Sequence, residues 1–329
     1  MKRCLSCYLP LNASEIDFHE KCSKSFFGEK LVPDLSITEE DLKELALKLI
    51  SHRLSITGVQ PKLSVHLSPG ENHNERKRFT IIGLLGDYIL KPQSDSYLEL
   101  PENEDLTMNL AAISKIQVVP HSLIRTKSRK LAYITKRIDR LTGTARKPAS
   151  TRQPLIETEK RHMEDMCQLT ERLSENKYHG SYEQIAKVIK IYSSQPGLDL
   201  VNFAEIILFS FLTGNADMHL KNFSLIYDLK SSPVLAPAYD LLCTKIVNPI
   251  DDEDLALSLN GKKKKIKIND FKKAFTNMGL DIKQQENIFK KFEKSKNKWL
   301  EFIEISFLSE KFKCDYKELV QSRFERFSL

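Results

Sequence analysis

The chain has 329 residues, of which 41% are hydrophobic and 29% charged, and its formal net charge is +7. This length suffices for a sizeable core in one large or two modest domains. Apolar residues are too many for a disordered chain, and glycine and proline are too few for a collagen-like one. The longest apolar stretch, at 206–212, is far shorter than the roughly 20 residues of a membrane span, so no membrane association is expected.

Cysteine usage and the first residues bear on localisation. No apolar segment follows the basic start of the chain, so a secretory signal peptide is not expected. Six cysteines in a chain of this length argue against a disulfide framework and favour a reducing compartment. We therefore expect a cytoplasmic protein, and the sequence leaves open whether it is exported into another cell.

The first 22 residues contain the pairs Cys4-x-x-Cys7 and His19-x-x-Cys22. Thiolate and imidazole are the ligands that tetrahedral zinc prefers, and two short pairs let one loop supply each half of a site. We predict a zinc knuckle in an N-terminal segment at 1–35. The alternative, in which these four side chains only pack in the segment, stays open.

The pattern after this segment changes from mainly strand to mainly helix. A helix is expected at 36–50, where Leu42, Leu45 and Leu49 share one face. Strands are expected at 62–67, 79–83, 88–91, 122–126 and 131–137, with a helix at 102–114 between them. Further helices are expected at 162–173, 181–192, 200–213, 270–278, 283–307 and 315–326. This order predicts an α+β protein with a β-rich N-lobe at 36–140 and a mainly helical C-lobe at 141–329.

Polar residues crowd the segment 214–222, between an apolar helix and a strand-like stretch at 223–227. Buried polar groups are costly unless they serve one another or a ligand. The spacing Asp217-x-x-x-x-Asn222 is that of a protein-kinase catalytic loop, in which the Asp accepts a proton and the Asn holds a magnesium ion. Asp240 follows 18 residues after Asn222, where a kinase places its second metal-binding carboxylate. The alternative is a buried polar network that only holds two segments together.

Upstream residues extend the kinase pattern. Lys91 ends the strand expected at 88–91, as the phosphate-binding lysine does in kinases. Glu104 opens the following helix, where an ion pair with Lys91 is expected. The segment 55–62 precedes a strand, as a phosphate-covering loop would, although Gly58 is its single glycine. An ordinary turn is therefore an equally good interpretation of that segment.

Basic residues are concentrated near the C-terminus. Residues 261–329 carry 18 Lys and Arg against 10 Asp and Glu, whereas the rest of the chain is nearly balanced. The lysine run at 262–265 could bind a polyanion, but such runs are more often solvated loops. A nucleic-acid-binding regulator is thus one alternative function, although no helix-turn-helix or RNA-binding motif is apparent. A catalytically inactive kinase fold used as a binding module is the other.

Seven segments in one order over roughly residues 50–245 together resemble the HipA family of toxin kinases. They are SITGVQPK at 55–62, ILKP at 89–92, NE at 103–104, KRIDR at 136–140, EDMCQ at 164–168, GNxDxHxKNFS at 214–224 and PAYDL at 237–241. The chain is most similar to the short HipT type, in which a separate small protein, HipS, supplies a subdomain of full-length HipA. The resemblance implies a bilobal protein-kinase-like fold and an ATP-dependent serine/threonine protein kinase. It further implies the toxin of a toxin–antitoxin system that phosphorylates an aminoacyl-tRNA synthetase.

The resemblance also implies partners. These are a HipS-like small antitoxin and a HipB-like helix-turn-helix protein that binds DNA, so that this chain reaches DNA only indirectly.

Roles for individual residues follow from the resemblance. Asp217 would be the catalytic base, with Asn222 and Asp240 holding Mg²⁺. Residues implied in binding ATP are Lys91, Gly58, Glu104, Lys136, Ile138 and His219. Ile138 departs from the usual phenylalanine, which puts the packing at the adenine hinge in doubt. Ser55 and Thr57 would be autophosphorylated, and a phosphate there adds about −1.5 to −2 charges that oppose ATP binding.

Overall fold

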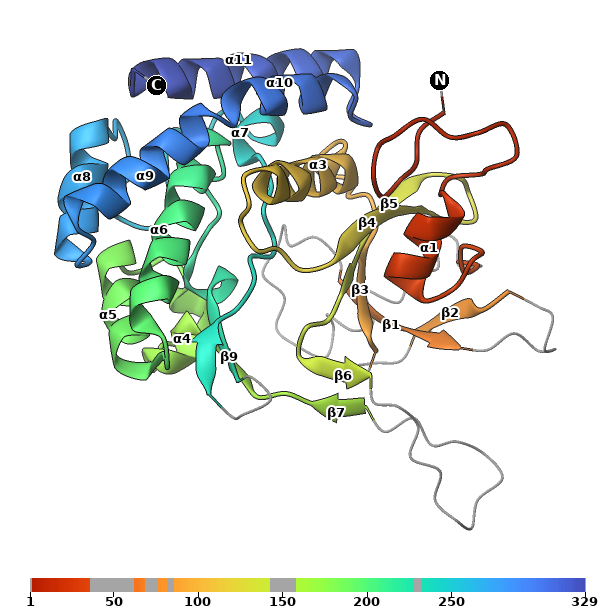
Figure 1. Cartoon of the computed structure of the whole chain (residues 1–329), viewed down its shortest axis with the longest axis horizontal. Helices are drawn as coiled ribbons and strands as arrows, with labels where there is room; N and C mark the ends of the chain where they lie inside the picture. Colours follow the sequence, from red (N-terminus) through yellow and green to blue (C-terminus); the bar gives the residue numbers. More distant parts are fainter. Residues whose placement is uncertain are drawn as a thin grey trace, which may run out of the picture. The chain divides into compact units, whose positions relative to one another are not determined.

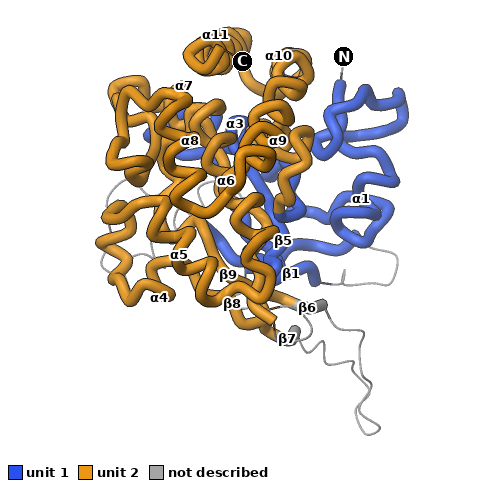
Figure 2. Tube along the Cα trace, turned by 60° about the vertical axis from the view of Figure 1, so that its left-hand side comes forward, with its two compact units in different colours: residues 1–105, 119–138 blue, residues 106–118, 139–329 orange. Residues whose placement is uncertain are grey.

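The computed structural model describes residues 2–35, 62–68, 76–81, 86–142, 158–227 and 232–328. The helix expected at 36–50 and the segment 55–61 lie outside the described residues. The chain divides into two compact units, shown in Figure 2. Unit 1 comprises residues 1–105 and 119–138, and unit 2 comprises residues 106–118 and 139–329. Within the described part, no helix is both long enough and apolar enough to cross a bilayer.

Unit 1 is built on a five-stranded antiparallel sheet with the order β2-β1-β3-β5-β4 (Figure 1). The strands are β1 (Leu63–Ser68), β2 (Arg78–Ile81), β3 (Tyr88–Lys91), β4 (His121–Arg125) and β5 (Leu131–Lys136). Each lies within one or two residues of its predicted position where the structure describes it. The central strand β3 pairs with a strand on each edge, and its Leu90 and Lys91 are buried.

Among the described residues, helices α1 and α3 contribute to unit 1. Helix α1 (Glu20–Phe27) ends at Gly28, whose left-handed φ of 76° favours glycine. Its Phe27 ring packs edge-on against Phe79 and contacts Tyr88 of the sheet. Helix α3 (Leu100–Ile113) begins in unit 1 and runs on into unit 2 after Asp105.

Unit 2 is mainly helical, and its central element is α6 (Pro196–Leu212). This helix is apolar nearly all round and contacts α5, α9, α11 and β10, so its residues form the middle of the core. The other helices are α4 (Met166–Leu169), α5 (Tyr182–Tyr192), α7 (Thr244–Val247), α8 (Ile268–Asn277), α9 (Ile282–Glu293), α10 (Lys296–Glu304) and α11 (Glu310–Arg326), with short 3₁₀ turns at Ser174–Asn176 and Leu220–Asn222. The strands are β6 (Arg140–Thr142) paired with β7 (Thr158–Lys160), and β8 (Met163–Asp165), β9 (Ser224–Tyr227) and β10 (Pro233–Leu235) in a second antiparallel sheet. The predicted α+β fold class is confirmed.

Two predicted helices of unit 2 are wrong in extent. The segment predicted as helix 162–173 instead forms strand β8 and the short helix α4. Met163 pairs with Ile226 of β9, and Asp165 then starts α4 through reciprocal side-chain and backbone hydrogen bonds with Gln168. The helix predicted at 283–307 is split into α9 and α10. The break allows the rings of Phe292 and Trp299 to meet at 5.9 Å in one core.

Candidate active site

The predicted catalytic loop follows α6 through a tight turn at Gly214, whose φ is 68°. A Cβ there would lie 2.5 Å from the end of the Leu319 side chain, so a larger residue would require Leu319 to move and would strain the backbone. The Asn215 side chain accepts a hydrogen bond from the Asp217 backbone N–H at 3.1 Å. The Asp217 carbonyl accepts from the Asn222 side-chain amide at 3.1 Å. The loop thus joins Asp217 and Asn222 directly, although five residues separate them.

The Asp217 carboxylate is held by a residue that the sequence analysis missed. Tyr178 donates its hydroxyl to Asp217 Oδ1 at 2.6 Å, and its ring packs edge-on against His219 at 5.0 Å. Burial, and then the charge of Asp217, raise the pKa of Tyr178, so its hydroxyl remains a donor at neutral pH. No spacing rule could have indicated this contact across 39 residues. Asp217 itself remains partly exposed, as a group that must meet a substrate should be.

His219 occupies the centre of the loop and is buried. Burial lowers the pKa of His219 to about 4, although the charges of Asp217 and Asp240 act to raise it. The imidazole is therefore neutral at pH 7. Both carboxylates therefore lie close enough to this ring to influence its pKa. Within the described part of the chain, Nδ1 of His219 is buried without a hydrogen-bond partner.

The segment that carries Asp240 is fastened to the catalytic loop. Tyr239 donates to the Lys221 carbonyl at 3.0 Å and shares a hydrogen bond with Ser224 Oγ at 2.6 Å. Asp240 has a left-handed φ of 57°, which aspartate tolerates better than most residues. Two carboxylates and an amide then stand on linked segments. Oxygen donors of this kind are the ligands that Mg²⁺ prefers, so the residues fit such an ion.

In unit 1, Lys91 and Glu104 form the ion pair expected from the sequence. Lys91 Nζ lies 2.5 Å from Glu104 Oε1, and the residues are only 3% and 2% exposed. Lys91 ends β3 opposite Tyr133 of β5, and its ammonium lies 5.3 Å from the centre of that ring. The attraction between these two buried groups offsets part of the cost of removing each of them from water.

The other predicted nucleotide-binding residues are only partly described. Lys136 Nζ lies 5.5 Å from the centre of the Phe26 ring, and burial lowers the pKa of Lys136. Ile138 is half-buried at the end of unit 1. Gly58, Ser55 and Thr57 lie outside the described residues, so their roles stay predictions.

The N-terminal cysteines and histidine also converge. The ligand atoms of Cys4, Cys7, His19 and Cys22 all lie within 4.8 Å of one another, in unit 1. All six cysteines of the chain are free thiols.

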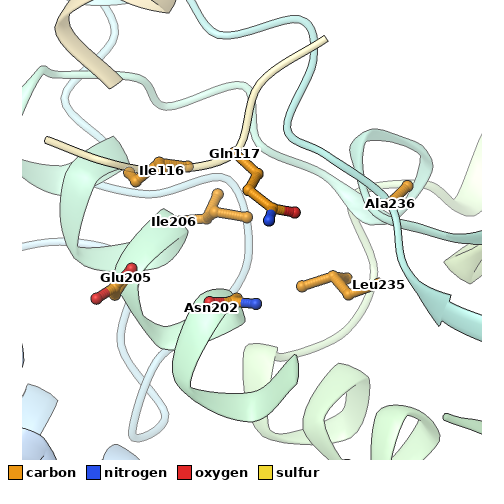
Figure 3. A pocket seen from close by; sticks show the side chains of 7 residues that line it. All are labelled: Ile116, Gln117, Asn202, Glu205, Ile206, Leu235 and Ala236. Atoms are coloured by element: carbon orange, nitrogen blue, oxygen red, sulfur yellow. The ribbon is translucent and has the colours of Figure 1, made fainter. Parts of the chain in front are cut away.

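A hollow of about 270 Å³, partly open to solvent, lies in unit 2 (Figure 3). Glu205, one of its lining residues, is paired with Lys291 at 2.6 Å. The lining residues are Ile116, Gln117, Asn202, Glu205, Ile206, Leu235 and Ala236. None of the predicted site residues is among them, so the hollow carries no part of the candidate chemistry.

Comparison with known proteins places this geometry in a family. The model of the HipA-like C-terminal domain matches residues 54–299, about three quarters of the chain. The chain belongs to the HipA-like C-terminal domain family. The family expected from the sequence is thereby confirmed, while the short HipT type stays a prediction.

Relatives and a solved structure agree with this assignment. The chain is 34% identical over 207 residues to "Putative kinase Y4dM" of Sinorhizobium fredii, covering 62% of this chain and 48% of that protein. It is 29% identical over 197 residues to "Putative kinase" of Haemophilus influenzae, covering 57% and 52%. The chain thus spans about half the length of these curated relatives. The Shewanella oneidensis HipA, solved with HipB and its operator DNA, superposes with a TM-score of 0.66 at 24% identity, covering 84% of this chain and 65% of that one. This last likeness concerns the fold.

Proposed function

We propose that this protein is an ATP- and Mg²⁺-dependent serine/threonine protein kinase. The observation that carries the proposal is the loop around His219, in which a hydrogen bond joins Asn222 to Asp217 and Tyr239, the neighbour of Asp240, donates to the Lys221 carbonyl. Membership of the HipA-like family supports it. Phosphoryl transfer needs positioning and charge neutralisation more than covalent chemistry, and these residues supply both.

The hydrogen bonds of the loop assign a different role to each of its polar atoms in this proposal. Tyr178 occupies Oδ1 of Asp217, so Oδ2 is the oxygen that accepts the proton of the attacking hydroxyl. The Asn222 amide nitrogen is bonded to the Asp217 carbonyl, which leaves the amide oxygen for the metal ion, with the Asp240 carboxylate as its second ligand. Mg²⁺, when bound, neutralises charge on the phosphates of ATP.

Residues of unit 1 bind the nucleotide in this proposal. Lys91, oriented by Glu104, contacts the ATP phosphates. Lys136, Ile138 and Gly58 contribute to nucleotide binding, as the family resemblance implies.

We further infer that the kinase is the toxin of a HipT-type toxin–antitoxin system and phosphorylates an aminoacyl-tRNA synthetase. The family resemblance supports this, with a HipS-like antitoxin and a HipB-like DNA-binding protein as partners. The C-terminal lysines do not favour direct binding of nucleic acid by this chain. Lys262, Lys263 and Lys264 are each paired with a carboxylate, of Asp270, Glu253 and Asp252 respectively.

The test is phosphate transfer from Mg-ATP by the full chain and by Asp217→Asn, which keeps the shape of the side chain but removes the base. We expect a loss of roughly 10²–10⁴-fold. Asp281→Asn is the matched control, because Asp281 caps α9 in unit 2 and asparagine caps a helix equally well. Undiminished transfer by folded Asp217→Asn contradicts the proposal, and ATP binding without transfer by the unchanged chain would identify a binding module instead.

Autophosphorylation of the loop at 55–58 is tested with the same proteins. We expect mass spectrometry to find phosphate on Ser55, and secondarily on Thr57, in the unchanged chain and not in Asp217→Asn. Equal phosphate on Ser55 in both proteins would show that another kinase adds it, and self-regulation through this loop would be wrong.

A further inference from the structure

Four side chains that the proposed phosphoryl transfer does not use meet at the N-terminus of unit 1. His19 Nδ1 lies 3.3 Å from Cys7 Sγ and 3.7 Å from Cys22 Sγ, and Cys4 completes the group. Around a tetrahedral zinc ion, a nitrogen and a sulfur ligand are about 3.6 Å apart and two sulfurs about 3.8 Å, given the usual bond lengths. The two observed nitrogen–sulfur separations lie on either side of the first value, and all four ligand atoms lie within 4.8 Å of one another.

The second nitrogen of His19 supports the same conclusion. Nε2 lies 3.0 Å from the Pro10 carbonyl oxygen, which can only accept, so Nε2 carries the proton. Nδ1 is then unprotonated, and its lone pair faces the sulfurs. Histidines that bind metals usually donate their other N–H to a carbonyl or carboxylate in this way. The lone pair of Nδ1 is therefore available to a cation bound among the three sulfurs.

The turn that carries Cys4 and Cys7 closes at Tyr8, whose backbone N–H donates to the Cys4 carbonyl at 2.9 Å, and Tyr8 fastens this turn to helix α3. Tyr8 is fully buried and has an unfavourable left-handed φ of 63°. Its hydroxyl donates to Asp105 Oδ2 at 2.6 Å, and Asp105 Oδ1 receives a hydrogen bond from His121 at 2.7 Å. Asp105 directly follows Glu104, the partner of Lys91. One hydrogen bond thus connects the Cys/His turn to the helical turn that holds the phosphate-binding lysine.

The same N-terminal segment also covers an edge of the sheet. The Leu5 carbonyl accepts from the Leu123 backbone N–H at 3.3 Å and from Ser122 Oγ at 3.2 Å. Asp17 accepts from Arg125 at 2.9 Å. The segment between Leu5 and Asp17 has no helix and almost no strand structure, so ordering it loses much conformational entropy. A bound metal ion offsets this loss by cross-linking the loop.

We propose that Cys4, Cys7, His19 and Cys22 bind one structural zinc ion, and that the ordered turn positions the Lys91–Glu104 pair through Tyr8 and Asp105. Zinc binding and the ordering of α3 stand independently of the kinase proposal. The consequence for nucleotide binding rests on it. Tyr8 is a positioning residue in this scheme, since it acts through Asp105.

The metal site is tested on the full chain, purified without a metal-chelating tag. We expect elemental analysis to find one zinc per chain, and Co²⁺ in its place to give the visible absorption of a tetrahedral thiolate site. Cys22→Ser should lose the metal, whereas Cys314→Ser, at an exposed cysteine outside the cluster, should keep it. A folded, metal-free chain whose four residues bind neither Zn²⁺ nor Co²⁺, or one with a disulfide among the three thiols, overturns the site.

The coupling is tested with Tyr8→Phe, which keeps the ring and all four ligands but removes the hydroxyl. We expect unchanged zinc content and roughly 10-fold faster amide hydrogen exchange over residues 100–106, because a hydrogen bond to a carboxylate is lost. Removal of zinc from the unchanged chain should speed the same exchange. Unaltered exchange in both cases overturns the coupling.

Nucleotide binding separates the two proposals. ATP affinity should fall several-fold in Tyr8→Phe without loss of zinc. If exchange over 100–106 responds as expected but the unchanged chain binds no ATP, the kinase proposal fails and the zinc-dependent ordering stands. If the unchanged chain binds ATP and Tyr8→Phe binds it equally well, positioning of Lys91 through Tyr8 is wrong.

Discussion

The charged groups of the two units are held in opposite ways. In unit 1, Lys91 and Glu104 neutralise each other in a buried ion pair. In unit 2, the Asp217 carboxylate accepts a hydrogen bond from the Tyr178 hydroxyl and lies at a partly exposed position. An enclosed ion pair of the first kind fixes the position of the lysine, whereas a carboxylate at a partly exposed position stays accessible to other molecules. In the proposed mechanism, unit 1 therefore supplies fixed charge and unit 2 supplies the reacting base.

The largest expected effect concerns stability. Lys91→Met leaves Glu104 buried without its partner and should destabilise the chain by about 3–5 kcal/mol. Asp217→Asn keeps a hydrogen-bond acceptor for Tyr178 and should lower the free energy of unfolding by no more than about 1 kcal/mol. Urea unfolding of the full chain measures both.

A double variant separates the cost of the unpaired Glu104 from the loss of ATP binding. Lys91→Met with Glu104→Leu removes both charges and should recover most of the stability lost in Lys91→Met, while ATP binding stays lost. Similar small losses of stability in Lys91→Met and Asp217→Asn would contradict the conclusion that the two units hold their charged groups differently.

Variants of the two units should also differ in how their ATP binding depends on Mg²⁺. Asn222→Ala and Asp240→Ala should weaken ATP binding in the presence of Mg²⁺ by at least about 10-fold and leave the weaker metal-free binding unchanged. Lys91→Met, in contrast, should weaken binding with or without the ion. Calorimetric titration with and without Mg²⁺ measures this, with Asn202→Ala on α6 as a control. Equal ATP affinity with and without Mg²⁺ in the unchanged chain would contradict the metal assignment.

The smallest expected effect is a pH dependence of opposite sign in the two units. Burial raises the pKa of Glu102, on α3 in unit 1, from 4.5 to about 7. The folded state then binds this proton more tightly, so the contribution to stability is complete below about pH 4.5 and is lost as pH rises through about 7. Burial lowers the pKa of His219 from 6.5 to about 4, so its contribution is present above about pH 6.5 and is lost as pH falls through about 4.

Two neutral variants measure these contributions. Compared with the unchanged chain, Glu102→Gln should gain stability, on the order of 1–3 kcal/mol, between about pH 5 and pH 7.5. His219→Gln should lose a similar amount of relative stability over the same rise. Unfolding at the two pH values checks both, and parallel pH profiles in all three proteins would refute the assigned titrations.

Features that depend on neighbours in the chain were predictable. The strand character of 88–91 predicted β3 to the residue, and the spacing of Asp217 and Asn222 indicated a loop that brings them together. The helix at 162–173 was mispredicted, because pairing with β9 outweighed the helical pattern.

Contacts between distant residues required the folded chain. Tyr178 meets Asp217 across 39 residues and Tyr8 meets Asp105 across 97, and nothing in either local sequence marks the partner. The order β2-β1-β3-β5-β4 likewise places Lys91 of β3 between β1 and β5. Neither strand is next to β3 in the sequence, because β2 separates β1 from β3, and α3 and β4 separate β3 from β5. Spacing and periodicity report which residues share a loop, a strand or a helix face, because the backbone sets those positions within a few residues. Packing that brings separate segments together decides which hydroxyl contacts Asp217. It also decides which helix the N-terminal segment contacts.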